Sequence, residues 1–132
     1  MKKTRRRIQP SSLAIVEKGF RGAIEEQYGN IVWLSEIMLA MGARHSLLLC
    51  GAAVATCFKE QKQQSIVIGD ICVNTISDFK SSVESMLARG GQVWVLEKDL
   101  VLFGQQVQLI DGVNISPSIA QLCLEHDKVW FW

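Results

Sequence analysis

Short apolar runs alternate with segments of helical spacing along this chain, and that alternation constrains the fold more than any other feature. The runs are SLAIVE (12–17), HSLLLC (45–50), QVWVL (92–96) and KVWFW (128–132). Continuous apolar runs are typical of parallel strands that are covered on both faces. Strands that alternate with helices imply right-handed crossovers and a mostly parallel sheet. We therefore expect a three-layer α/β fold, with about five strands and helices on both faces.

The first helix is predicted from residue 31, because Ile31, Leu34, Ile37, Met38 and Met41 recur at helical spacing. Asn30 is its expected N-cap and Gly42 its expected stop. Two further helices are predicted over 52–59 and from an N-cap at Ser77, the latter with Phe79, Val83, Met86 and Leu87 on one face. The last helix is predicted over 116–124, with Pro117 at its first position.

The remaining segments carry weaker patterns. Residues 18–29 are expected to form a loop with a little helix, and 105–112 an extended piece with an Asp-Gly turn. Residues 65–73 are rich in β-branched residues but contain Gly69-Asp70, which suits either a short strand or an extended loop.

The chain of 132 residues is expected to fold as one domain over 12–132, preceded by a flexible basic arm over 1–11. The arm holds five of the fourteen basic residues: Lys2, Lys3, Arg5, Arg6 and Arg7. The rest of the chain has nine basic and thirteen acidic residues, a net charge of −4. Such an arm can contact nucleic acid or an acidic partner. Because no basic face on the body matches it, we do not expect nucleic-acid binding.

Composition indicates a cytoplasmic protein that does not enter a membrane. No apolar run approaches the ~20 residues of a membrane span, and no apolar segment follows the basic start as in a secretory signal. The four cysteines are then expected to be reduced thiols. They form no CxxC motif and no zinc-type spacing, so no metal is predicted. Gly19-x-x-Gly22 matches neither dinucleotide nor P-loop patterns, so no cofactor is predicted.

Among the thiols, Cys57 and Cys50 are the candidates for chemistry, although core packing is the more common role of a free cysteine. Cys57 stands out because it follows the second strand within a helix, but about a turn and a half in, where the helix N-terminus no longer lowers a thiol pKa. His45 is expected to be structural, and His126 to lie in an exposed connection. Trp130 and Trp132 should share one face of the last strand and Phe131 the other, for core packing or a subunit interface.

The working end of the fold is predicted at 92–104. There, a buried strand ends in the polar turn Glu97, Lys98 and Asp99, and the chain is apolar again up to Gly104. Open α/β sheets bind ligands outside the carboxyl ends of their strands. This turn is therefore the expected site, and Leu100 to Phe103 is expected to expose apolar surface that favours oligomers.

Over 12–132 the chain resembles the DsrE/DsrF-like family, which includes the TusB, TusC and TusD subunits of the bacterial sulfur relay. The resemblance rests on the order and spacing of five pieces: SLAIVE, MLAMGARHSLLLCGAAV, SDFKSSVESMLARGG, QVWVLEKDLVLFG, and QLIDGV followed by ISPSIAQLCLEHDKVWFW. It implies a small flavodoxin-like domain that assembles as a homo-oligomer, or as a hetero-oligomer with other subunits of the family.

Active members of the family carry a persulfide on a cysteine at the strand end, eight residues before the glycine that matches Gly104. Here that position is Leu96, and the frequent arginine before the glycine is Phe103. A leucine side chain has no nucleophile to accept sulfur. The resemblance therefore implies an accessory, non-catalytic subunit of intracellular sulfur trafficking, with a sulfur-carrier protein as a possible partner and Glu97 to Asp99 as a binding surface. Two alternatives stay open: a persulfide carrier with its thiol relocated to Cys57 or Cys50, and a small-molecule-binding module at the strand-end crevice.

Overall fold

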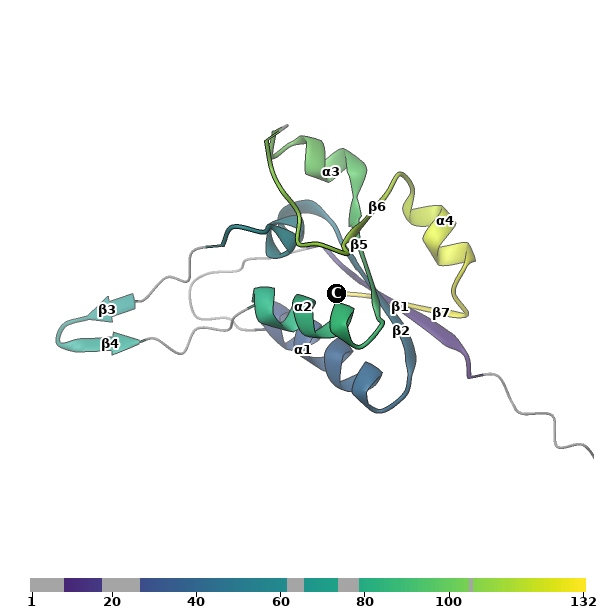
Figure 1. Cartoon of the computed structure of the whole chain (residues 1–132), viewed down its shortest axis with the longest axis horizontal. Coiled ribbons are helices and arrows are strands. Elements are labelled where there is room, and N and C mark those ends of the chain that lie inside the picture. Colours follow the sequence, from purple (N-terminus) through teal and green to yellow (C-terminus); the bar gives the residue numbers. More distant parts are fainter. Residues whose placement is uncertain (1–8, 18–26, 62–65, 74–78, 105) are drawn as a thin grey trace, which may run out of the picture.

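The structure is a computed structural model and describes residues 9–17, 27–61, 66–73, 79–104 and 106–132. Its elements in chain order are β1 (Ser11–Val16), α1 (Gln27–Ala40), β2 (Arg44–Leu49), the 3-10 helix η1 (Gly51–Cys57), β3 (Ile66–Ile68), β4 (Ile71–Val73), α2 (Phe79–Ala88), β5 (Gln92–Leu96), α3 (Glu97–Val101), β6 (Asn114–Ser116), α4 (Ile119–Leu124) and β7 (Lys128–Phe131) (Figure 1). Most of the predicted basic arm, the start of the loop predicted over 18–29 and the N-cap predicted at Ser77 lie outside the described residues.

Five parallel strands form the central sheet, in the order β6-β5-β2-β1-β7. The chain moves outward from β1 through β2 and β5 to β6, and then returns across the sheet to place β7 on the other side of β1. Strands β3 and β4 form a separate antiparallel hairpin. The predicted three-layer, flavodoxin-like α/β fold with a parallel sheet is confirmed.

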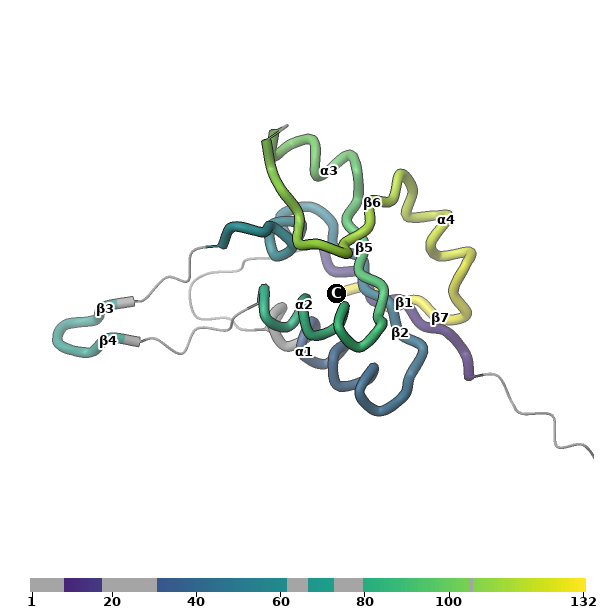
Figure 2. The backbone as a smooth tube through the Cα atoms, in the orientation of Figure 1, coloured from purple at the N-terminus to yellow at the C-terminus, as the bar shows by residue number. Residues whose placement is uncertain are grey.

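The two faces of the sheet are covered unequally. On one face, α1, α2 and η1 pack over a large cluster that includes Val32, Leu47, Val54 and Met86. On the other face, α4 covers a smaller cluster built around Leu13, Leu48, Leu96 and Leu122. Figure 2 shows α1 and α2 together on one side of the strands and α4 on the other. Residues of the continuous run 47–49 alternate between the two clusters, which is why all of them are apolar.

Helix α1 begins at Gln27, so Asn30 lies inside it and the predicted N-cap is wrong. The predicted stop at Gly42 is confirmed, because Gly42 has a φ of 88° and Ala43 N–H donates to the carbonyl of Met38 at 3.0 Å. This is a Schellman end. Helix α2 ends in the same way, with a φ of 80° at Gly90 and a bond from Gly91 N–H to the carbonyl of Met86 at 2.9 Å.

The apolar stripe predicted for α1 is only partly its buried face. Ile31 is buried, but Leu34 is 40% exposed and Met41 82% exposed. Val32 and Ser35 are buried instead, at 1% and 2%. The helix is rotated toward Ser35 because that hydroxyl bonds a buried histidine of β2, a polar contact that apolar periodicity does not register.

Three other segments differ from the predictions. The helix predicted over 52–59 is a 3-10 helix that ends at Cys57. Ser116, the first residue of the last predicted helix, instead ends the edge strand β6 (Asn114–Ser116). Pro117 precedes α4 instead of opening it, and the cap is Ser118, whose Oγ accepts from Gln121 N–H at 3.3 Å. The helix begins after Ser118 because this serine supplies the side-chain acceptor that an N-cap needs.

His45 has the structural role that was predicted. Its ring is 3% exposed and sits between two buried hydroxyls, with Nδ1 2.7 Å from Ser12 Oγ and Nε2 2.9 Å from Ser35 Oγ. Burial lowers the pKa of His45, and the nearby His126 lowers it further. The imidazole therefore joins β1, β2 and α1 in its neutral form.

We expect acid to destabilise the fold through His45. Because its pKa is lower in the folded state than its usual 6.5, the unfolded chain binds the proton first, so stability is complete above pH 6.5 and is lost as the pH falls below it. The slope can reach about 1.4 kcal/mol per pH unit. Urea unfolding of the wild type and of His45→Gln at pH 7.5 and pH 5.5 measures it. The variant should be less stable than the wild type at pH 7.5, but its free energy of unfolding should fall less between pH 7.5 and pH 5.5. An equal fall in both proteins would contradict the assignment of this pH dependence to His45.

Candidate functional site

The carboxyl ends of β1, β2 and β5 meet at one edge of the sheet, and the residues that follow them are tied together by backbone contacts. Cys50 N–H donates to the carbonyl of Val16 at 2.9 Å. Gly51 N–H donates to Asp99 Oδ2 at 2.8 Å. We refer to this group as the strand-end site; it comprises Glu17, Cys50, Gly51, Leu96, Lys98 and Asp99. Sequence reasoning had not included Glu17 or Gly51, although a glycine directly after an apolar run was a visible signal.

The polar turn predicted after β5 is the first turn of α3, which begins at Glu97 without any intervening loop. Glu97 and Lys98 are exposed, so they form part of the surface. Asp99 turns inward and its carboxylate caps the start of η1 through Gly51. The three residues that were predicted as one binding surface therefore divide into two exposed side chains and one structural acceptor.

Leu96 lies under this surface and is 2% exposed. It belongs to the cluster on the α4 face of the sheet, together with Leu13, Leu48 and Leu122. A side chain in that environment contributes to the core. It offers neither a nucleophile nor a hydrogen-bonding group at the end of β5.

Cys50 lies one strand away from Leu96. The register pairs Leu49 with Val95, which places the next residues, Cys50 and Leu96, side by side in the same cluster. The thiol is 3% exposed. Burial, together with smaller contributions from the carboxylates of Asp99 and Glu17, raises the pKa of Cys50 to about 12, and Lys98 opposes this rise. Cys50 is therefore a protonated thiol at pH 7, with very little of the nucleophilic thiolate.

Cys57 lies on the opposite face of the sheet, away from Leu96. It is completely buried in the cluster under α1 and α2. Burial raises the pKa of Cys57 to about 12, against a smaller lowering by Thr56. Of the two candidate thiols, the structure brings only Cys50 to the strand-end site.

The end of α3 exposes apolar side chains, as predicted. Val101 is 68% and Leu102 81% exposed. Phe103 packs edge-on against Phe58, with ring centroids 5.1 Å apart and an interplanar angle of 83°. Gly104 follows with a φ of 97°, which suits glycine, and no heavy atom lies within 4 Å of the position that a Cβ would take.

The other candidates lie elsewhere. His126 contacts the carbonyl of Leu122 through Nδ1 at 2.6 Å. Within the described ranges, no group of three His, Cys, Asp or Glu side chains could hold a metal ion. No helix of the described chain is both long enough and apolar enough to span a membrane.

Comparison with known proteins gives a likeness of fold. No family model matches the chain, and no curated protein sequence matches it. Among solved structures, the crystal structure of the YchN protein from E. coli is similar with a TM-score of 0.71 and 22% identity, over 92% of this chain and 99% of that chain. At this identity the likeness describes architecture. The chain has a DsrE-like, flavodoxin-like α/β fold.

Proposed function

We propose that this chain is an accessory, non-catalytic DsrE-like subunit of intracellular sulfur trafficking, which acts through its oligomeric and partner interfaces. The observation that carries the proposal is the state of the strand-end site. Leu96, at the position that the resemblance assigns to the persulfide cysteine, is 2% exposed, and the thiol beside it, Cys50, is buried, with a pKa raised to about 12 by burial and by the carboxylates of Asp99 and Glu17. Sulfur acceptance needs an accessible thiolate.

The apolar surface supports a role in assembly. In addition to the end of α3, the last strand β7 exposes Phe131 at 64%, and Trp132 directly after it is 50% exposed. Exposed aromatic residues are enriched at the centres of protein interfaces. A partner from the same fold class, or a sulfur-carrier protein, would cover this surface while another subunit performs the chemistry.

One alternative has a specific observation in its favour. Cys50 adjoins Leu96, and Lys98 lowers its pKa even though burial and the carboxylates outweigh that effect. A partner that neutralised Asp99 and opened the site could convert Cys50 into a persulfide carrier. The proposal therefore has to be tested on the thiol itself.

Cyanolysis tests the proposal. We expect a chain with Cys72→Ser and Cys123→Ser, incubated with a polysulfide donor and desalted, to release no thiocyanate while folded, because only the buried Cys50 and Cys57 remain. The same chain loaded in urea should release it, since unfolding returns both thiols to an ordinary pKa. Alkylation rates give a second readout, with Cys50 at least about a hundredfold slower in the folded chain than in the unfolded chain.

Near-stoichiometric thiocyanate from the folded chain, lost on adding Cys50→Ser but kept with Cys57→Ser, would establish the persulfide carrier and overturn the accessory role. The pair is a matched control, because both substitutions replace a buried thiol with a hydroxyl. The experiment uses the isolated chain and then the chain with cell extract, so that activation by a partner is also detected.

A further inference from the structure

The hairpin of β3 and β4 stands apart from the sheet. It lies at the far end of the long axis of the molecule (Figure 1). Its register pairs Val67 with Cys72 and Ile68 with Ile71 across a two-residue turn, in which Gly69 has a φ of 61°. A glycine of positive φ at the first turn position, followed by a residue of negative φ, is typical of a type II′ hairpin.

Both faces of this hairpin are apolar. Cross-strand partners share a face, so Ile68 and Ile71 lie on one side and Val67 and Cys72 on the other. The exposed fractions are 68% for Val67, 65% for Ile68 and 67% for Ile71. The only charged residue between 66 and 73 is Asp70, in the turn. An isolated two-stranded hairpin is marginally stable in water at best, and a third strand beside it would stabilise it and cover part of its apolar surface.

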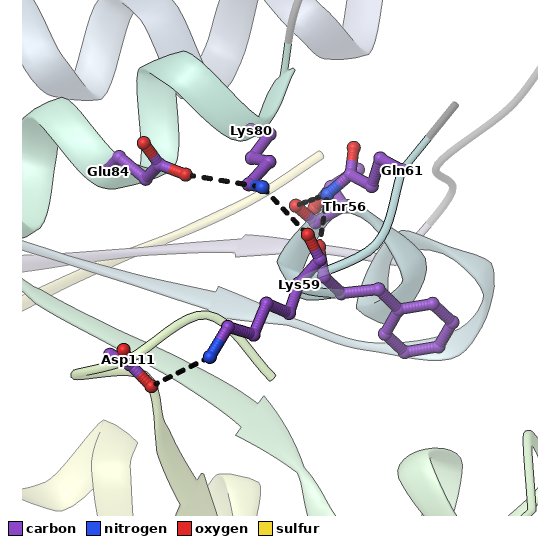
Figure 3. Close-up of polar contacts among 7 residues, drawn as sticks. Thr56, Lys59, Gln61, Lys80, Glu84 and Asp111 are labelled. Atoms are coloured by element: carbon purple, nitrogen blue, oxygen red, sulfur yellow. Dashed lines mark hydrogen bonds and ion pairs between the residues drawn. The ribbon is translucent and has the colours of Figure 1, made fainter. Parts of the chain in front are cut away.

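The chain that leads to the hairpin is held firmly at its base (Figure 3). Gln61 Nε2 donates to the carbonyls of Thr56 and Phe58 at 2.6 and 2.9 Å. Lys80 Nζ, from α2, donates to the carbonyl of Lys59 at 2.7 Å. Lys59 N–H donates to the carbonyl of Gln108 at 2.8 Å. The body therefore fixes the chain as far as Gln61, close to the point where the hairpin segment begins.

Strand β7 offers an open edge of matching character. It is the outermost strand on its side of the sheet. Trp132 N–H donates to the carbonyl of Ile15, and the carbonyl of Trp132 accepts from Glu17 N–H, so the backbone groups of Trp132 point toward β1. Successive residues of a strand direct these groups to opposite sides, so the N–H and C=O of Phe131 point to the outer edge. Trp130 and Phe131 are successive residues of the strand and lie on opposite faces, so both faces are apolar here too. The only charge within the strand is Lys128, at its start.

We propose that β3 of one copy pairs antiparallel with β7 of a second copy and extends its sheet. The pair next to a two-residue turn is hydrogen-bonded within the hairpin, so Val67 directs its N–H and C=O outward. In this register Val67 lies opposite Phe131, and Ile68 lies opposite Trp130. Because the two strands run antiparallel, Asp70 in the hairpin turn lies opposite Lys128 at the start of β7. The one charged residue of the hairpin, Asp70, is then close to the one charged residue of β7, Lys128. On both faces of the extended sheet, apolar side chains of β3 lie beside apolar side chains of β7.

The other edge strand fits the hairpin poorly. Strand β6 has three residues and two of them, Asn114 and Ser116, are polar. Each copy has one hairpin and one β7 edge, and two copies that exchange hairpins reciprocally would use both surfaces in a two-fold dimer. This inference concerns how copies of the chain join and does not depend on sulfur chemistry. The pairing can therefore be absent while the accessory role holds, and the pairing can be present while the accessory role fails.

Disulfide trapping tests the pairing directly. Two variants, Ile68→Cys and Trp130→Cys, are made in the chain with Cys72→Ser and Cys123→Ser. In the proposed register the two positions are a non-hydrogen-bonded antiparallel pair, whose Cβ separation suits a disulfide. When the two variants are mixed and oxidised, a covalent dimer with one of each should form at least tenfold more than in either variant alone. A mixture of Ile68→Cys with Ile115→Cys, on the β6 edge, should stay at the level of single variants.

A second variant keeps the test valid if Trp130→Cys fails to fold. Val67→Pro removes the outward N–H without removing a bond inside the hairpin, and an edge strand tolerates proline. It should weaken self-association at least tenfold in analytical ultracentrifugation while circular dichroism stays unchanged. Any one of three results would overturn the proposal. The wild type could be monomeric at 100 µM, or its self-association could be unaffected by Val67→Pro. The third is that Ile68→Cys alone forms as much covalent dimer as the mixture does.

Discussion

Replacing Leu96 by alanine should lower the free energy of unfolding by about 2–5 kcal/mol, the range for a leucine removed from a packed core. Leu96 is 2% exposed and belongs to the smaller cluster, which also holds residues of β1, β2 and α4. That cluster has one short helix above it, which leaves few neighbours able to close the cavity. Urea unfolding followed by circular dichroism gives the value.

Leu124 is a matched control for this substitution. It is also a leucine, it belongs to α4, and it is 88% exposed. Leu124→Ala should change the free energy of unfolding by no more than about 0.5 kcal/mol. Equal losses in the two variants would mean that Leu96 is not the core residue we describe, and would reopen the end of β5 as an accessible site.

Gly51→Ala is the second substitution with a large expected effect. Gly51 has a φ of 53°, and a Cβ there would lie 2.8 Å from the backbone oxygen of Glu17. The left-handed conformation costs about 1–2 kcal/mol for other residues, and forced repacking typically adds about 1–3 kcal/mol. We expect a loss of roughly 2–5 kcal/mol. Because Gly51 N–H also holds Asp99, the variant should make Cys50 easier to alkylate.

Gly104→Ala separates the two contributions. Gly104 also has a positive φ, of 97°, but no atom lies within 4 Å of its would-be Cβ. This variant should show the conformational cost alone, about 1–2 kcal/mol. The difference between the two variants then measures the contact with Glu17. If the two variants lose the same free energy of unfolding, the end of β1 moves aside for the added Cβ without cost. The strand-end site would then not be tightly packed.

The elements of this fold were largely predictable because the strongest signals are local. The apolar runs marked four of the sheet strands to within a residue or two, and Gly42 marked the end of the first helix by its positive φ. Strand β6 was not predictable in this way. Its three residues, Asn-Ile-Ser, carry little β signal, and they form a strand because the neighbouring β5 offers an edge.

The site was less predictable than the fold, since it depends on contacts between distant segments. Sequence could place Leu96 at the end of a strand, but the proximity of Cys50 follows from the order of β2 and β5 in the sheet. The face occupied by Cys57 follows from the 3-10 geometry of η1. The rotation of α1 likewise follows from the bond between Ser35 and His45, two residues that only tertiary structure brings together.

The position of β7 has a consequence for how the protein is made. Strand β1 sits between β2 and β7, and the contact of Ser11 with Asp127 spans 116 positions. At about 5–20 residues per second, a ribosome needs roughly 6–23 s to produce the residues between them. Throughout that time β1 can pair on at most one side, since β2 is its only other neighbour in the sheet. A nascent chain therefore carries an unprotected strand edge far longer than local structure takes to form, which makes early association with a chaperone or with a neighbouring nascent chain a physical risk that is built into the topology.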